Sequence, residues 1–178
     1  MRPTLAILTL LAFSTPALAQ EAAPGPAIRS FGAVFDVTDP DFATPTDMEY
    51  KVAFEISQAS NSPERVNAAL NTVARFINMH AAAGVPRENI RAAVVVHGSA
   101  GWELLDDDAY RARHGVNNPN AELIRELTAF GARVILCGQT AASRGIPRDG
   151  LLSGVEVALS AMTAFLVLQE DGYHVNPW

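Results

Sequence analysis

The residue with the clearest chemical potential is Cys137, the only cysteine in the chain. It closes the apolar run that follows Arg133, and Gly138, Gln139 and Thr140 come directly after it. This pattern is typical of a strand that ends just before a helix, where free backbone N–H groups and the helix dipole lower the pKa of a thiol. Because the thiolate is the nucleophile, the pattern favours covalent sulfur chemistry. The alternative is a buried, inert cysteine that only packs.

A second apolar run ends in His97, with Gly98 and Ser99 after it. The carboxyl ends of parallel strands meet at one edge of a sheet, and ligands bind at that edge. His97 and Gly98 are therefore candidates for binding a ligand or for tuning the thiol of Cys137. The alternative for His97 is a structural histidine whose hydrogen bonds are satisfied within the fold.

Other chemistries have little support in the sequence. The four histidines are not spaced like zinc ligands, and the acidic run Asp106–Asp108 is predicted to start a helix rather than to bind calcium. No phosphate-binding loop or dinucleotide fingerprint occurs, so no metal and no cofactor is expected. A net charge of −6 with a single lysine, Lys51, argues against nucleic acid and anionic membrane surfaces as partners.

The first nineteen residues have the composition of a secretory signal peptide. Arg2 supplies a positive charge, and the apolar run from Leu5 to Phe13 is shorter than the ~20 residues that span a bilayer. Ala17 and Ala19 are the small residues that a signal peptidase reads. We therefore expect cleavage after Ala19, a periplasmic location and no stable membrane anchor. Export makes an unpaired cysteine unusual, because cysteines in oxidising compartments usually form pairs.

The elements that would position these residues alternate between strand and helix along the chain. Residues 20–47 are rich in proline and show no sustained period, which predicts an extended N-terminal arm. Apolar and alternating runs in the domain that follows, 48–178, predict strands at 51–56, 92–97, 133–137, 155–158 and 173–175. Helical spacing predicts a helix that begins at Ser62-Pro63 and stops at Gly84, and further helices at 106–113, 120–130, 139–144 and 160–170.

This alternation predicts an α/β fold of three layers, with a mostly parallel sheet of about five strands flanked by helices. The strand order cannot be read from the chain. The segment from Val155 to Leu168 is apolar on more than one face, with Glu156 as its only charge. Such a segment is buried either against the sheet or between subunits. Both readings remain open from the sequence alone.

The domain from Tyr50 to Trp178 resembles the DsrE/DsrF-like family of sulfur-relay proteins, in its exported single-domain branch. The segments that carry the resemblance are VVVHGSAGWELL, NPNAELIRELTAFGARVILCGQTAASRGI and VEVALSAMTAFLVLQEDGY. The resemblance implies a compact α/β fold, assembly into homo-oligomers and a cysteine that carries sulfur as a persulfide. The cysteine of the family falls on Cys137.

The leading hypothesis is therefore a sulfur carrier or sulfurtransferase that exchanges sulfane sulfur with a donor or acceptor protein. In this hypothesis Gly138, Gln139 and Thr140 supply hydrogen-bond donors to the thiolate or persulfide on Cys137. Two alternatives remain. The chain is either a non-catalytic homo-oligomeric module that binds a small ligand or a partner, or a thiol-redox sensor that forms an intersubunit disulfide.

Overall fold

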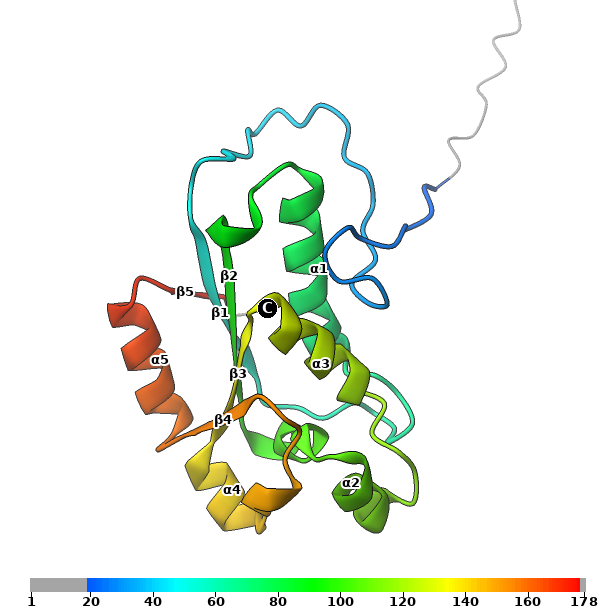
Figure 1. Cartoon of the computed structure of the whole chain (residues 1–178), viewed down its shortest axis with the longest axis vertical. Coiled ribbons are helices and arrows are strands. Elements are labelled where there is room, and N and C mark those ends of the chain that lie inside the picture. The colour runs from blue at the N-terminus through cyan, green and yellow to red at the C-terminus, as the bar shows by residue number, and fades with distance from the viewer. Residues whose placement is uncertain (1–18, 177–178) are drawn as a thin grey trace, which may run out of the picture.

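The computed structural model describes residues 19–176. Within them, one sheet of five strands is parallel throughout, in the order β4-β3-β2-β1-β5 (Figure 1). The predicted α/β class and parallel sheet are confirmed. The strands are β1 (Tyr50–Ile56), β2 (Ile90–Val96), β3 (Arg133–Cys137), β4 (Val155–Ala158) and β5 (His174–Asn176).

Helices cover both faces of the sheet, which gives the three layers predicted from the sequence. Figure 1 shows α5 on one side of the sheet and both α1 and α3 on the other. The α-helices are α1 (Ala68–Ala82), α2 (Asp107–His114), α3 (Ala121–Phe130), α4 (Gly138–Arg144) and α5 (Ala161–Glu170). Three 3-10 helices complete the described elements: η1 (Arg87–Asn89), η2 (Gly98–Leu104) and η3 (Arg148–Gly150).

The strands β1, β2 and β3 alternate their side chains between two cores of unequal size. Val94 and Leu136 belong to the larger core under α1 and α3. Val95 and Ile135 belong to the smaller core, where Ala164 and Leu168 of α5 pack. A residue two positions after Val95 or Ile135 therefore faces α5, as long as the backbone stays extended.

The predicted start of the first helix at Ser62-Pro63 is wrong. Helix α1 begins at Ala68, because the side chain of Asn67 accepts hydrogen bonds from the backbone N–H groups of Ala69 and Leu70 and so caps it. Ser62 instead lies in a turn, where its hydroxyl accepts a hydrogen bond from the N–H of Glu64.

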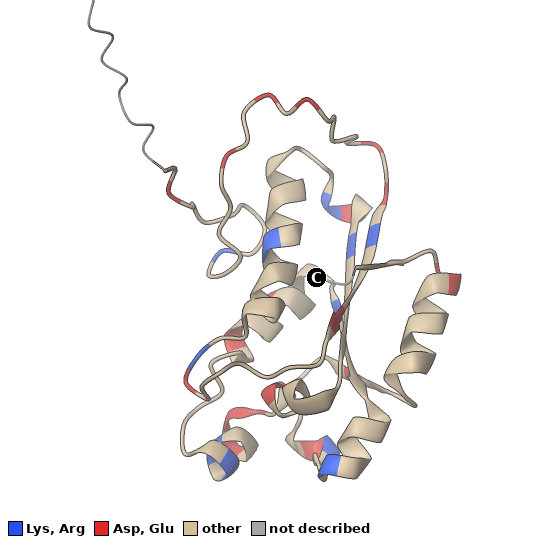
Figure 2. Cartoon of the chain, turned by 180° about the vertical axis from the view of Figure 1, so that it is seen from behind, with Lys and Arg blue, Asp and Glu red and all other residues tan. Residues whose placement is uncertain are grey.

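The N-terminal arm folds back on itself before it reaches the sheet. A short antiparallel bridge joins Ala23 to Val34, and the loop between them surrounds Asn78 of α1. Ile28 of this loop is buried in the larger core. The segment that follows, residues 35–49, is mostly exposed and carries five acidic residues and no basic one (Figure 2).

In the part of the chain from residue 19 to residue 176, no helix is both long enough and apolar enough to cross a bilayer. The proposed signal peptide, apart from Ala19, lies outside the described residues.

Candidate functional site

Cys137 is the last residue of β3 and pairs in register with Ala158 of β4. It follows Ile135 by two positions on an extended strand, so its side chain faces α5. Its exposed fraction is 6%, and it forms no disulfide. The thiol is therefore nearly enclosed at the carboxyl edge of the sheet, beside the start of α5.

Four hydrogen-bond donors surround the thiol. They are the backbone N–H groups of Gln139 and Thr140 in the first turn of α4, the N–H of Ala161 at the start of α5 and the Thr140 hydroxyl. Burial raises the pKa of the Cys137 thiol, but these hydrogen bonds outweigh it and bring the pKa below its ordinary value. The first turns of two helices thus favour the thiolate, as the sequence predicted for one of them.

Gly98 and Gly138 allow close backbone approaches around this site. A Cβ atom on Gly138 would lie 2.5 Å from the carbonyl oxygen of Ala158. Gly98 has a positive φ of 59°, and a Cβ atom there would lie 2.5 Å from the carbonyl oxygen of Ser57. The Gly98 N–H donates to the Thr140 hydroxyl at 3.2 Å, so Thr140 connects the loop after β2 to the thiol.

His97 lies on the same face of the sheet as Cys137, at the end of the neighbouring strand. Its backbone is extended, with φ −147° and ψ −170°, so its ring continues the side of Val95 and faces α5. The ring nitrogen Nε2 lies 2.8 Å from the Glu55 carboxylate of β1. Within the described chain, no hydrogen bond links His97 directly to Cys137. The two residues thus lie at one edge of the sheet, but the His97 ring pairs with Glu55 and not with the thiol.

Glu55 and Ala161 are parts of the site that the sequence reasoning missed. The alternating run around β1 indicates that Glu55 shares a face with Ala53, but only the strand order shows that this face adjoins His97. The contact with Ala161 depends on where α5 crosses the sheet. No local pattern specifies that crossing.

A buried polar network supports the loops at the same edge. Glu103, at the end of η2, is 2% exposed and accepts hydrogen bonds from the Ser60 N–H and the Asn67 side chain. Burial raises the pKa of the Glu103 carboxyl, although these bonds oppose it. Asn118 donates to the carbonyl oxygens of Glu103 and Leu105. The network therefore fixes the η2 loop that carries Gly98.

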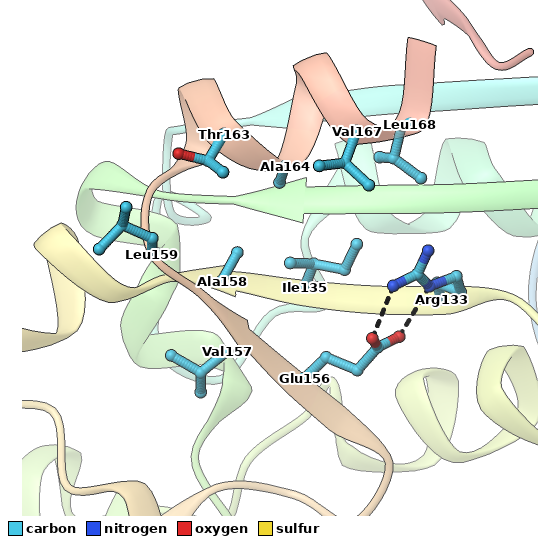
Figure 3. A pocket seen from close by; sticks show the side chains of 10 residues that line it. All are labelled: Arg133, Ile135, Glu156, Val157, Ala158, Leu159, Thr163, Ala164, Val167 and Leu168. Carbon is cyan, nitrogen blue, oxygen red and sulfur yellow. Dashed lines mark hydrogen bonds and ion pairs between the residues drawn. The ribbon is translucent and has the colours of Figure 1, made fainter. Parts of the chain in front are cut away.

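A hollow of about 240 Å³ lies between α5 and the strands β3 and β4 (Figure 3). Its lining is mostly apolar, and an ion pair between Arg133 and Glu156 stands at one end. Over residues 19–176, no group of three or more His, Cys, Asp or Glu side chains is placed to hold a metal ion.

Residues 50–177 match the model of the DsrE/DsrF-like family. The chain belongs to this family. The match covers the whole described sheet, including Cys137 and the loops around it. No curated protein matches this DsrE/DsrF-like chain in sequence.

Two solved structures resemble this DsrE/DsrF-like chain. A protein of unknown function from Methanobacterium thermoautotrophicum, MTH1491, superposes with a TM-score of 0.54 and 25% identity, over 73% of this chain and 100% of that chain. The YchN protein from E. coli has a TM-score of 0.54 and 18% identity, over 74% of this chain and 100% of that chain. The similarity to YchN supports the fold alone.

Proposed function

We propose that this protein carries sulfane sulfur as a persulfide on Cys137. Membership of the DsrE/DsrF-like family supports a sulfur-relay role in general. The observation that carries the specific proposal is the set of four donors around the Cys137 thiol, drawn from the first turns of two helices. These donors favour a thiolate before transfer and would stabilise the anionic persulfide after it.

The proposed transfer begins with attack of the Cys137 thiolate on the outer sulfur of a donor persulfide, R–S–SH. A new S–S bond forms at Cys137 while the S–S bond of the donor breaks, and the donor sulfur leaves as RS⁻. The leaving thiolate takes its proton from the solvent, and the His97 ring, held by its hydrogen bond to Glu55, lies at the same edge of the sheet. Cys137 is then a persulfide. An acceptor thiolate reverses the same steps to remove the outer sulfur.

Intact-mass spectrometry after exposure to polysulfide tests this proposal. We expect the wild-type protein to gain the mass of sulfur and the Cys137→Ser variant to gain none. The exposed Ser143→Ala variant, one turn further along α4, is the matched control and should load like the wild type. If wild type and Cys137→Ser end with the same mass gain, the carrier proposal is wrong and a binding module becomes the better account.

We further propose that the protein is a homo-oligomer that associates through α5. Ala164 and Leu168 of this helix pack on the sheet, but Met162 is 74% exposed and Leu166 is 65% exposed. Leu159, just before the helix, is 73% exposed. Contiguous apolar side chains on a surface are typical of protein–protein contacts.

Light scattering on a size-exclusion column tests the association. We expect the Leu166→Asp variant to shift from the oligomer to the monomer, because a carboxylate would lose its hydration in the contact. Phe42→Asp is the control, since Phe42 is 89% exposed in the segment before β1 and should leave the mass unchanged. A wild-type protein that is a monomer at all concentrations would remove this proposal.

The apolar leader at residues 1–19 supports a periplasmic location for the protein. In that location a donor or acceptor protein would meet Cys137 outside the cytoplasm. The proposed exchange needs no cofactor, because the thiol itself bonds the transferred sulfur.

A further inference from the structure

The hollow beside β3 and β4 is a separate feature from the donors around the thiol. Its floor is the α5 face of the sheet, with Ile135 and Ala158, and its opposite wall is α5, with Ala164, Val167 and Leu168 (Figure 3). Most of these groups are aliphatic. The volume of about 240 Å³ is smaller than the roughly 300–1,000 Å³ of sites for drug-sized ligands, so it suits a slender molecule.

One end of the hollow is formed by Arg133, whose guanidinium group uses only two of its three nitrogens in hydrogen bonds to the described residues. Nε and Nη2 of Arg133 donate to the two carboxylate oxygens of Glu156 at 2.9 and 2.7 Å. The remaining guanidinium nitrogen, Nη1, makes no hydrogen bond to the described residues, and Figure 3 shows it pointing toward α5. The ion pair holds the guanidinium in place, and Nη1 retains two donors for an anionic oxygen.

The other end of the hollow lies next to the thiol. Arg133, Ile135 and Cys137 alternate along β3 and face α5, and four residues of strand span about 13 Å. Cys137 does not line the hollow, but its register partner Ala158 does. A ligand that lies along β3 with its anion at Arg133 would therefore direct its far end toward the sulfur.

We infer that this hollow binds the organic part of a small thiol or persulfide, an aliphatic chain with a carboxylate at Arg133 and its sulfur at Cys137. The inference rests on the proposed function of Cys137, for which it names a substrate class. The aliphatic lining matches the chain, and Nη1 matches the carboxylate. Glu156 forms an ion pair with Arg133 and the charge of Asp171 also acts on the guanidinium, so a monoanion fits the site better than a phosphate or another multiply charged ligand.

Affinity labelling of the full chain tests this inference without requiring any sulfur transfer. The probe is ω-bromo-octanoate, which the Cys137 thiolate alkylates as a new S–C bond forms and bromide leaves. We expect the labelling rate, followed by intact mass, to saturate with probe concentration and to fall when octanoate is added. A rate that rises linearly with concentration, or an unlabelled Cys137, would overturn the inference.

Two variants locate the binding. Arg133→Met should weaken saturation by about tenfold, because it removes a charge-assisted hydrogen bond to the carboxylate. Val167→Trp should abolish saturation by filling the hollow. The matched controls are Arg91→Met, which alters an exposed ion pair of β2, and Gln169→Trp, which alters an exposed α5 side chain outside the hollow. Both controls should label like the wild type.

The neutral reagent iodoacetamide separates this inference from the reactivity of the thiol. We expect all four variants to react with it at the wild-type rate. If Arg133→Met and Val167→Trp saturate with ω-bromo-octanoate as the wild type does, the hollow does not bind the chain, whatever the polysulfide experiment shows. If polysulfide loading fails but labelling still saturates and depends on Arg133, the hollow is a binding site and the carrier role is wrong.

Discussion

Replacing Asn78 with alanine is expected to lower the free energy of unfolding by about 3 kcal/mol and to release the N-terminal arm. The Asn78 side chain is fully buried and makes five hydrogen bonds to the arm. Its oxygen accepts from the N–H groups of Ala27 and Ile28. Its two amide hydrogens are shared among the carbonyl oxygens of Ile28, Phe31 and Gly32. Alanine would leave these backbone groups without partners in a dry environment.

Chemical denaturation measures the loss of stability, and hydrogen exchange at Ala27 and Ile28 measures release of the arm. The matched control is Asn71→Ala on the same helix, where the side chain makes one arm contact, a 2.8 Å bond from the Gly32 N–H. We expect that variant to lose about 1 kcal/mol. Equal losses in the two variants would mean that Asn78 does not anchor the arm.

The sheet could be predicted well because its strands are local patterns. Arg133 followed by continuous apolar residues up to Cys137 indicated a strand, and the structure has β3 with the same bounds. The order of the strands is a different matter. β5 lies beside β1 and not beside β4, because α5 crosses the face of the sheet opposite to α1. The sequence pattern of α5 does not specify that face.

The start of α1 could not be predicted from the sequence because contacts with distant residues select its capping residue. Ser62-Pro63 has the form of a helix cap, but Asn67 caps the helix and is itself held by Glu103 and Asn120, which lie far along the chain. A cap of this kind is selected by tertiary contacts. One sequence signal could have indicated a polar stripe on this helix, namely the helical spacing of Asn67, Asn71 and Asn78.

The candidate site was predictable where it follows the ends of two strands, at Cys137 with its neighbours in sequence and at His97 with Gly98. Cys137, Gln139 and Thr140 are adjacent, so strand-then-helix chemistry applied to them directly. The contributions of Ala161 and Glu55 depend on how separate elements cross, which a single sequence does not encode in local patterns. From the sequence, the apolar surface of α5 could pack either against the sheet or against another subunit. In the described chain it is divided, with one side on the sheet and the other exposed.

Replacing Gly138 with alanine is expected to cost about 2 kcal/mol of stability and to raise the pKa of the Cys137 thiol. The new Cβ would lie 2.5 Å from the Ala158 carbonyl oxygen and 3.2 Å from that of Leu159. Both are backbone atoms, so β4 and the turn into α5 must move. That movement would carry the N–H of Ala161 away from the thiol and weaken one of the bonds that lower its pKa.

The pH dependence of iodoacetamide alkylation measures this change, because only the thiolate reacts. The midpoint of the rate should shift to higher pH in Gly138→Ala, and polysulfide loading near neutral pH should slow with it. Ser143→Ala is the matched control, since it alters an exposed residue of α4 and keeps every backbone N–H that binds the sulfur. Its midpoint should stay at the wild-type value. If Gly138→Ala loses stability while the pH midpoint of alkylation stays unchanged, α5 does not stabilise the thiolate. Only the first turn of α4 would then lower the pKa of the thiol.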